Sequence, residues 1–170
     1  PGASQVNGAV DYRPWCADAE CTTFASAALN MTPAAITTTG TCTGTQTVEV
    51  QVNDVVALTA YELEVTFNPN FIKVTGVVNG GFLSENGTSY GNYIDNVNGK
   101  LRFNWYQIGS GGDPGPKTGS GSLIKITFKS KGLAGESAFA ITAANSILVN
   151  WPDAFAIPFA VTGGATVNFG

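Results

Sequence analysis

The chain has 170 residues, a formal net charge of −4 and a pI of about 4.6, a length that suits one domain. Its eight lysines and arginines are scattered singly, so there is no basic patch for a nucleic-acid backbone. Only 12% of residues are charged, 44% are hydrophobic and 21 are glycines, a composition typical of an all-β extracellular module rather than a cytosolic enzyme. No apolar run approaches the length of a membrane span and no signal peptide is apparent, so an exported protein would be seen here in a mature or trimmed form.

Residues 1–45 are predicted to form an N-terminal arm, because they are rich in alanine, threonine and serine and contain few large apolar side chains. The segment from Gln5 to Tyr12 has the character of one extended strand, and the following proline ends it. Residues 22–35 are expected to be a loop, since Pro33 and the flanking threonines oppose a helix. An arm with so little apolar area must lie on a sandwich, its own or a neighbour's, to be ordered.

All three cysteines lie in this arm. Cys16 and Cys21 are five residues apart and can close a small disulfide loop in an oxidising compartment, which is the pairing that we predict. Cys42 could instead pair with either of them, and the sequence alone does not choose among the three pairings. A metal site is the weaker alternative, because the chain has three thiols and no histidine.

From Thr47 onward, apolar and polar residues alternate in short runs, the pattern of half-buried strands. The clearest run is Tyr61-Glu-Leu-Glu-Val-Thr-Phe67, which Asn68-Pro69-Asn70 ends before a second strand begins at Phe71. Asn98-Gly99 is a hairpin signal that leads into Leu101–Ile108, and Gly109–Gly121 is expected to be a long exposed loop. The runs recur about every eight to twelve residues without a helix, which predicts a two-sheet jelly-roll sandwich of about nine strands over residues 46–170. Its predicted core contains Val50, Leu63, Val65, Phe67, Phe103, Ile126 and Phe128.

Several of these stretches resemble one known family. Tyr61–Val74, with its inward strand ending at an Asn-Pro corner, is similar to the second and third strands of cohesin modules, and Gly121-Ser-Leu-Ile-Lys-Ile-Thr-Phe-Lys129 is similar to a later strand. The closing run from Ala140 to Val167 also matches, so the resemblance covers about residues 46–169. Cellulose-binding modules share this jelly roll, so the match supports the fold more strongly than it supports any particular ligand. Separately, Val10-Asp-Tyr-Arg-Pro-Trp15 resembles the tail that follows some bacterial surface β-helix repeats.

The cohesin resemblance implies an extracellular, non-catalytic sandwich that binds another protein. Cohesins hold the calcium-binding dockerin through one sheet face, which here would include the outward residues Arg102, Asn104 and Tyr106. The competing interpretation is that these three side chains only solvate a sheet.

The residues offer little for catalysis or for a cofactor. The chain has no histidine, and its acids lie mostly singly in predicted loops. Glu62 and Glu64 share one strand face about 7 Å apart, a separation that could suit a glycosidase, but two solvated charges on an outer face explain them better. We therefore expect no enzyme activity, no cofactor and no metal, and calcium binding has no motif to support it.

Two further surface features are candidates for glycans. Asn30-Met-Thr32 and Asn86-Gly-Thr88 are acceptor sequons for N-glycosylation. An aromatic platform for binding sugars could contain Trp15, Tyr90, Tyr93, Tyr106 and Trp151, although most such residues in a sandwich are core or corner residues.

Three functions follow from these patterns. The first is a structural subunit that assembles at the cell surface, with the arm of one copy added to a sheet edge of the next, a head-to-tail contact that generates a filament. Its contact residues would be Gln5, Val6, Val10 and Tyr12. The alternatives are a cohesin-like receptor for a dockerin-type protein and a carbohydrate-binding module.

Overall fold

The computed structural model describes residues 4–6, 9–11, 26–38, 44–107, 115–152 and 154–170, with side chains from residue 26 onward. The described parts contain fourteen strands and one short 3-10 helix, η1. The strands up to β7 are β1 (Ser4–Val6), β2 (Ala9–Asp11), β3 (Ala27–Thr32), β4 (Ala35–Thr38), β5 (Gln46–Phe67), β6 (Ile72–Asn79) and β7 (Gly87–Thr88). The later elements are β8 (Tyr93–Asp95), β9 (Lys100–Gln107), β10 (Lys117–Ser130), β11 (Gly135–Ile141), η1 (Ala143–Asn145), β12 (Ile147–Asn150), β13 (Phe159–Val161) and β14 (Ala165–Phe169).

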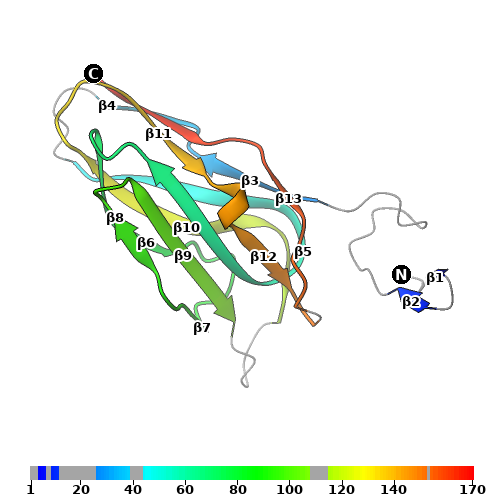
Figure 1. The fold of residues 1–170 in the computed structure, drawn as a ribbon. Helices are drawn as coiled ribbons and strands as arrows, with labels where there is room; N and C mark the ends of the chain where they lie inside the picture. Colours follow the sequence, from blue (N-terminus) through cyan, green and yellow to red (C-terminus); the bar gives the residue numbers. More distant parts are fainter. Residues whose placement is uncertain (1–3, 7–8, 12–25, 39–43, 108–114, 153) are drawn as a thin grey trace.

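The long strand β5 belongs to both layers of a sandwich (Figure 1). Its first half pairs antiparallel with β3 and β10, and its second half pairs with β9, β11 and β12. Between the halves, Asp54 and Ala57 have positive φ angles of 55° and 54°, a conformation that bends the strand and is uncommon for residues other than glycine. The bend passes the chain from one layer to the other.

The remaining strands extend the two layers. One layer contains β13, β3, the first half of β5, β10 and β6, and the other contains β12 and β11, the second half of β5, β9, and the short strands β8 and β7. Strand β14 pairs antiparallel with β11 and parallel with β4. The structure is therefore the all-β jelly-roll sandwich that the alternation predicts.

The core lies between the layers and confirms the predicted strand register. All seven predicted core residues are buried, with Val50, Leu63, Val65, Ile126 and Phe128 at 0% exposure. The side chain of Phe128 packs edge-on against Phe139, with ring centroids 5.0 Å apart. Full burial of a side chain of this size is worth about 1.5–3 kcal/mol, so the inward halves of the alternating runs supply much of the stability.

The region before residue 46 differs from the expected loop and arm. Residues 27–32 form β3, whose Ala27, Leu29 and Met31 are buried while the residues between them are not. Both β3 and β4 pair with strands of the sandwich. The sandwich therefore includes a segment that the sequence assigned to the arm, because its alanines and threonines hide a normal strand alternation.

The expected single strand over Gln5–Tyr12 is also different in the structure. Residues 4–6 and 9–11 form the antiparallel pair β1–β2, with Gln5 opposite Val10, and within the described residues these two strands pair only with each other. The backbone groups on one side of each of these two strands are therefore paired within the arm. In addition, part of the loop predicted over Gly109–Gly121 is strand, since β10 begins at Lys117.

Candidate functional site

The outer face of the β12–β5–β9 layer is the candidate site, and we call it the β9 face. It is formed by alternate residues whose neighbours in the chain point into the core. On β5 these are Ala60, Glu62, Glu64 and Thr66; on β9 they are Lys100, Arg102, Asn104 and Tyr106; on β12 they are Ile147 and Val149. Tyr93 of β8 lies opposite Arg102 and extends the face to its edge.

The strand register arranges these residues in rows across the sheet, because residues opposite one another share a face. One row is Val149, Ala60 and Tyr106, and the next is Ile147, Glu62 and Asn104. A third row runs from Glu64 through Arg102 to Tyr93. The face is thus largely apolar at the Ala60 end and charged at the Glu64 end.

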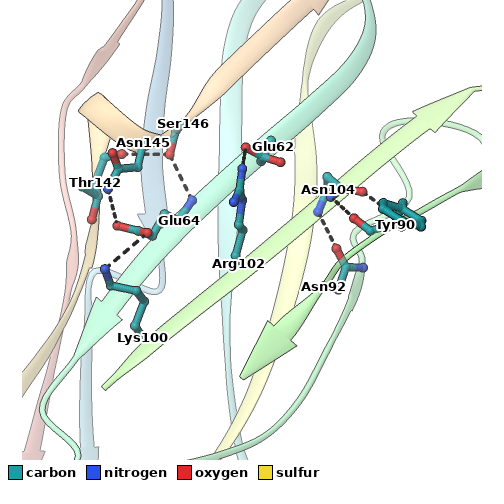
Figure 2. A network of polar contacts seen from close by, with 10 residues as sticks. All are labelled: Glu62, Glu64, Tyr90, Asn92, Lys100, Arg102, Asn104, Thr142, Asn145 and Ser146. Atoms are coloured by element: carbon teal, nitrogen blue, oxygen red, sulfur yellow. Dashed lines mark hydrogen bonds and ion pairs between the residues drawn. The ribbon is translucent and has the colours of Figure 1, made fainter. Parts of the chain in front are cut away.

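The charges at the Glu64 end are neutralised within the face. The Arg102 guanidinium donates to Oε1 of Glu62, and the Lys100 Nζ lies 3.5 Å from Oε2 of Glu64 (Figure 2). Glu62 raises the pKa of Arg102 through this hydrogen bond and its charge. The four charges of β5 and β9 therefore form two ion pairs, and the face has no net charge from them.

Glu64 is the most buried polar residue of the face. Its side chain is 8% exposed, against 27% for Glu62, and Asn145 of η1 donates to its Oε1 at 2.7 Å. This hydrogen bond is the main cause of the lowered pKa of Glu64; burial opposes it and Lys100 adds to it. The expectation of two solvated carboxylates is wrong for Glu64, because η1 comes from a distant part of the sequence and covers it.

A second polar network holds an exposed aromatic residue beside β9. The Asn104 Oδ1 accepts from the Tyr90 backbone N–H at 2.8 Å, its Nδ2 donates to the Tyr90 carbonyl, and the Asn104 N–H donates to Oδ1 of Asn92 at 2.8 Å (Figure 2). These hydrogen bonds hold the loop between β7 and β8, which contains Tyr90 and Asn92, against β9, while the Tyr90 side chain is 83% exposed.

Two hollows lie on this face. One, of about 300 Å³, is lined by Ala60, Glu62, Tyr90, Tyr106, Ile147 and Val149 among others. The other, of about 640 Å³, is lined by Glu62, Glu64, Arg102, Asn145, Ile147 and Phe159 among others. Glu62 and Ile147 line both hollows, so the two adjoin at the middle of the face.

The predicted partner-binding residues of β9 lie on this face. Arg102, Asn104 and Tyr106 point outward as expected, and Tyr106 is 41% exposed. Of the arm residues, Gln5, Val6 and Val10 lie in the β1–β2 pair, whereas Tyr12 and all three cysteines, Cys16 and Cys21 included, fall outside the described residues. Sequence reasoning missed Ile147 and Val149 as residues of this face.

The sequons and aromatic residues are placed as follows. Asn30 lies in β3 on the outer surface of the other layer, and its Oδ1 accepts from Nδ2 of Asn53 at 2.6 Å, while Asn86 is exposed. Tyr90, Tyr93, Tyr106 and Trp151 are all exposed, so none of these four candidate platform residues lies in the core. Trp15 lies outside the described residues.

Two further findings concern the part of the chain that the structure describes. No group of three or more acidic, cysteine or histidine residues is arranged to hold a metal ion there. No helix in those residues has the length and apolar character needed to cross a membrane.

Comparisons with known proteins identify the fold. The cohesin of OlpC in complex with Doc435 from Clostridium thermocellum matches with a TM-score of 0.67 and 13% identity, covering 85% of this chain and 95% of that one. The non-cellulosomal cohesin of the archaeon Archaeoglobus fulgidus gives 0.63 and 14%, covering 85% and 90%. The sixth cohesin of scaffoldin B from Acetivibrio cellulolyticus, in complex with the Cel5 dockerin, gives 0.65 and 12%, covering 85% and 98%.

At these low identities the structural matches show the fold alone, and no curated protein matches the sequence. The family model of the Cohesin domain, however, matches residues 33–150, a segment that runs from just before β4 to the end of β12 and includes the whole β9 face. The chain therefore belongs to the cohesin domain family.

Proposed function

We propose that the protein is a non-catalytic, extracellular receptor module that binds a dockerin-type protein on the β9 face. Family membership supports an interaction module, and two of the similar structures are described as complexes of a cohesin with a dockerin. No cofactor is needed for this function, since complementarity between the two protein surfaces supplies the binding.

The observation that supports this proposal most is the composition of the β9 face. Its charges are neutralised in pairs, while apolar groups remain at the surface: Ile147 and Tyr106 are both 41% exposed and Tyr90 is 83% exposed. Exposed aromatic and aliphatic side chains that line a hollow and are surrounded by polar groups are typical of the residues that dominate binding energy at protein interfaces.

The observations favour this receptor function over the assembly subunit that the sequence ranked first. The arm strands β1 and β2 pair with each other, so their backbone groups are already used on one side. Glycan binding is supported by the exposed tyrosines and Trp151, and the receptor function also uses Tyr90 and Tyr106.

The test is direct titration against dockerin modules. The probes are the two dockerins of the complexes above and the dockerins encoded in the genome of the source organism, each measured by calorimetry with calcium present. We expect at least one to bind with micromolar or tighter affinity, and Tyr106→Ala and Ile147→Asp each to weaken it by at least tenfold.

Val78→Asp is the matched control, because Val78 is 58% exposed and lies opposite Lys125 on the other layer. Its affinity should equal that of the wild type. The receptor function is wrong if no dockerin binds, or if Val78→Asp weakens binding as much as Ile147→Asp does. A concentration-dependent polymer in sedimentation, lost on deletion of residues 1–25, would restore the assembly subunit.

A further inference from the structure

A buried carboxylate underlies the edge of the β9 face where η1 crosses it. Glu64 points outward from β5, yet its side chain is only 8% exposed because Asn145 lies against it. Glu62, two residues away on the same side of the same strand, is more than three times as exposed at 27%. The difference between these two glutamates is made by η1.

Glu64 is also the principal anchor of η1. This three-residue helix has no buried residue and no side-chain hydrogen bond at its N-cap, Thr142, so apolar packing does not hold it. Instead, the Thr142 N–H donates to the Glu64 carbonyl at 2.9 Å and the Ser146 Oγ accepts from the Glu64 N–H at 3.1 Å. With the 2.7 Å bond from Asn145, the backbone and side chain of this one residue make three hydrogen bonds to the Thr142–Ser146 turn (Figure 2).

The turn leads directly into the docking residues. Ser146 is followed by Ile147, the first residue of β12, whose side chain lines both hollows of the β9 face. A change in the path of residues 142–146 therefore changes where Ile147 presents its side chain.

We propose that Glu64 is a positioning residue: its carboxylate holds Asn145, and through η1 it sets the place of Ile147 on the docking surface. The docking part of this inference rests on the proposed receptor function, whereas the hold on η1 does not. Lys100, 3.5 Å from Oε2, supplies a counter-charge from β9 on the opposite side. A hydrogen bond from a neutral amide to an ionised carboxylate is stronger than one between neutral groups. The negative charge of Glu64 therefore strengthens its hold on Asn145, in addition to the fit between the two side chains.

The first experiment needs no partner. Hydrogen exchange of the Thr142 and Ser146 amides and the methyl NMR signal of Ile147 are compared in the wild type, Glu64→Gln, Asn145→Ala and Lys100→Met. We expect at least tenfold faster exchange and a displaced Ile147 signal in Glu64→Gln and Asn145→Ala, with core amides of β10 unchanged. Lys100→Met is the control, because it removes the ion pair and leaves the Asn145 bond.

The outcomes separate clearly. Wild-type exchange and an unmoved Ile147 signal in Asn145→Ala overturn the proposal, even if Glu64→Gln fails to fold, because Asn145 is exposed and its substitution leaves the core intact. An effect in Lys100→Met as large as in Asn145→Ala also overturns it, since charge neutralisation rather than the amide bond would then hold the turn.

The second experiment measures the affinity of the dockerin that binds the wild type most tightly. Glu64→Gln and Asn145→Ala should weaken binding at least fivefold, whereas Val78→Asp on the other layer should leave the affinity unchanged. A displaced Ile147 signal with unchanged affinity overturns the role in docking. If no dockerin binds the wild type, the receptor function fails, while the exchange and methyl signals still decide whether Glu64 holds η1.

Discussion

The two halves of β5 present outer faces that differ in how their polar groups are satisfied. The outer face of the first half, which we call the polar face, includes Glu49, Gln51 and Lys125, and their contacts are made within the sheet: Gln51 donates to Glu49 at 2.9 Å, and Lys125, opposite Glu49 on the neighbouring strand β10, lies 3.5 Å from it. On the β9 face, Glu64 is instead bound by Asn145 of η1, which is not part of the sheet. Both faces come from the same alternating pattern, but the β9 face is in addition covered at one edge by η1 and hollowed beside it.

The difference is confined to the outer faces, because the inner faces form one core. Leu63 behind the β9 face and Ile126 behind the polar face are both at 0% exposure. Leu63→Ala and Ile126→Ala should therefore each lower the free energy of unfolding by about 2–5 kcal/mol, measured by urea denaturation. A cost below 1 kcal/mol for either variant would show that its layer does not share the core.

A second contrast between the layers is at glycine. Gly99, in the turn before β9, has a φ of 68°, and a Cβ there would clash with the Phe67 carbonyl. Gly99→Ala should therefore cost about 1–3 kcal/mol. Gly76 in β6 of the other layer has nothing within 4 Å of a Cβ, so Gly76→Ala should change stability by less than about 1 kcal/mol. Equal thermal unfolding temperatures for the two variants would contradict this contrast.

Features of the fold and the β9 face could be predicted from the sequence when they depended on residues close together in the chain, and not when they depended on residues far apart. The register of Tyr61–Phe67 followed from its own alternation, and the outward place of Arg102, Asn104 and Tyr106 followed in the same way. Strand β3 was missed although Ala27, Leu29 and Met31 alternate, because alanine, asparagine and threonine made the segment resemble a loop. The burial of Glu64 had no local signal at all, since it depends on where residues 142–146 return in space.

The β9 face should also respond to acid. The pKa of Glu64 is lowered from its usual 4.5, chiefly by the Asn145 hydrogen bond, and that of Asp95 at the end of β8 is lowered from 3.8, chiefly by Asn98. A carboxylate with a lowered pKa in the folded state stabilises the fold above its usual pKa, and this contribution is lost as the pH falls through the folded value.

The thermal unfolding temperature should therefore fall as the pH decreases from 5 to 2, and Glu64→Gln should show a smaller decrease, because it has lost one of the two groups. The measurement is calorimetry of both proteins over this range in buffers of equal ionic strength. Identical pH dependence in the two proteins would mean that folding does not lower the pKa of Glu64, contrary to the hydrogen bond and ion pair that it makes.

The smallest expected effect on stability is at two ion pairs that are nearly equal in exposure. Arg102 and Glu62 on the β9 face have side chains 45% and 27% exposed, and Lys125 and Glu49 on the polar face have side chains 46% and 28% exposed. Solvent-exposed pairs of this kind contribute about 0–1 kcal/mol. Arg102→Met and Lys125→Met should therefore each change the free energy of unfolding by less than about 1 kcal/mol. The two variants should differ only in binding. Arg102→Met leaves the charge of Glu62 uncompensated between the two hollows, so it should alter dockerin affinity, while Lys125→Met should not. Equal effects of both variants on affinity, measured under the conditions in which the dockerin binds the wild type, would mean that the two outer faces do not differ in function.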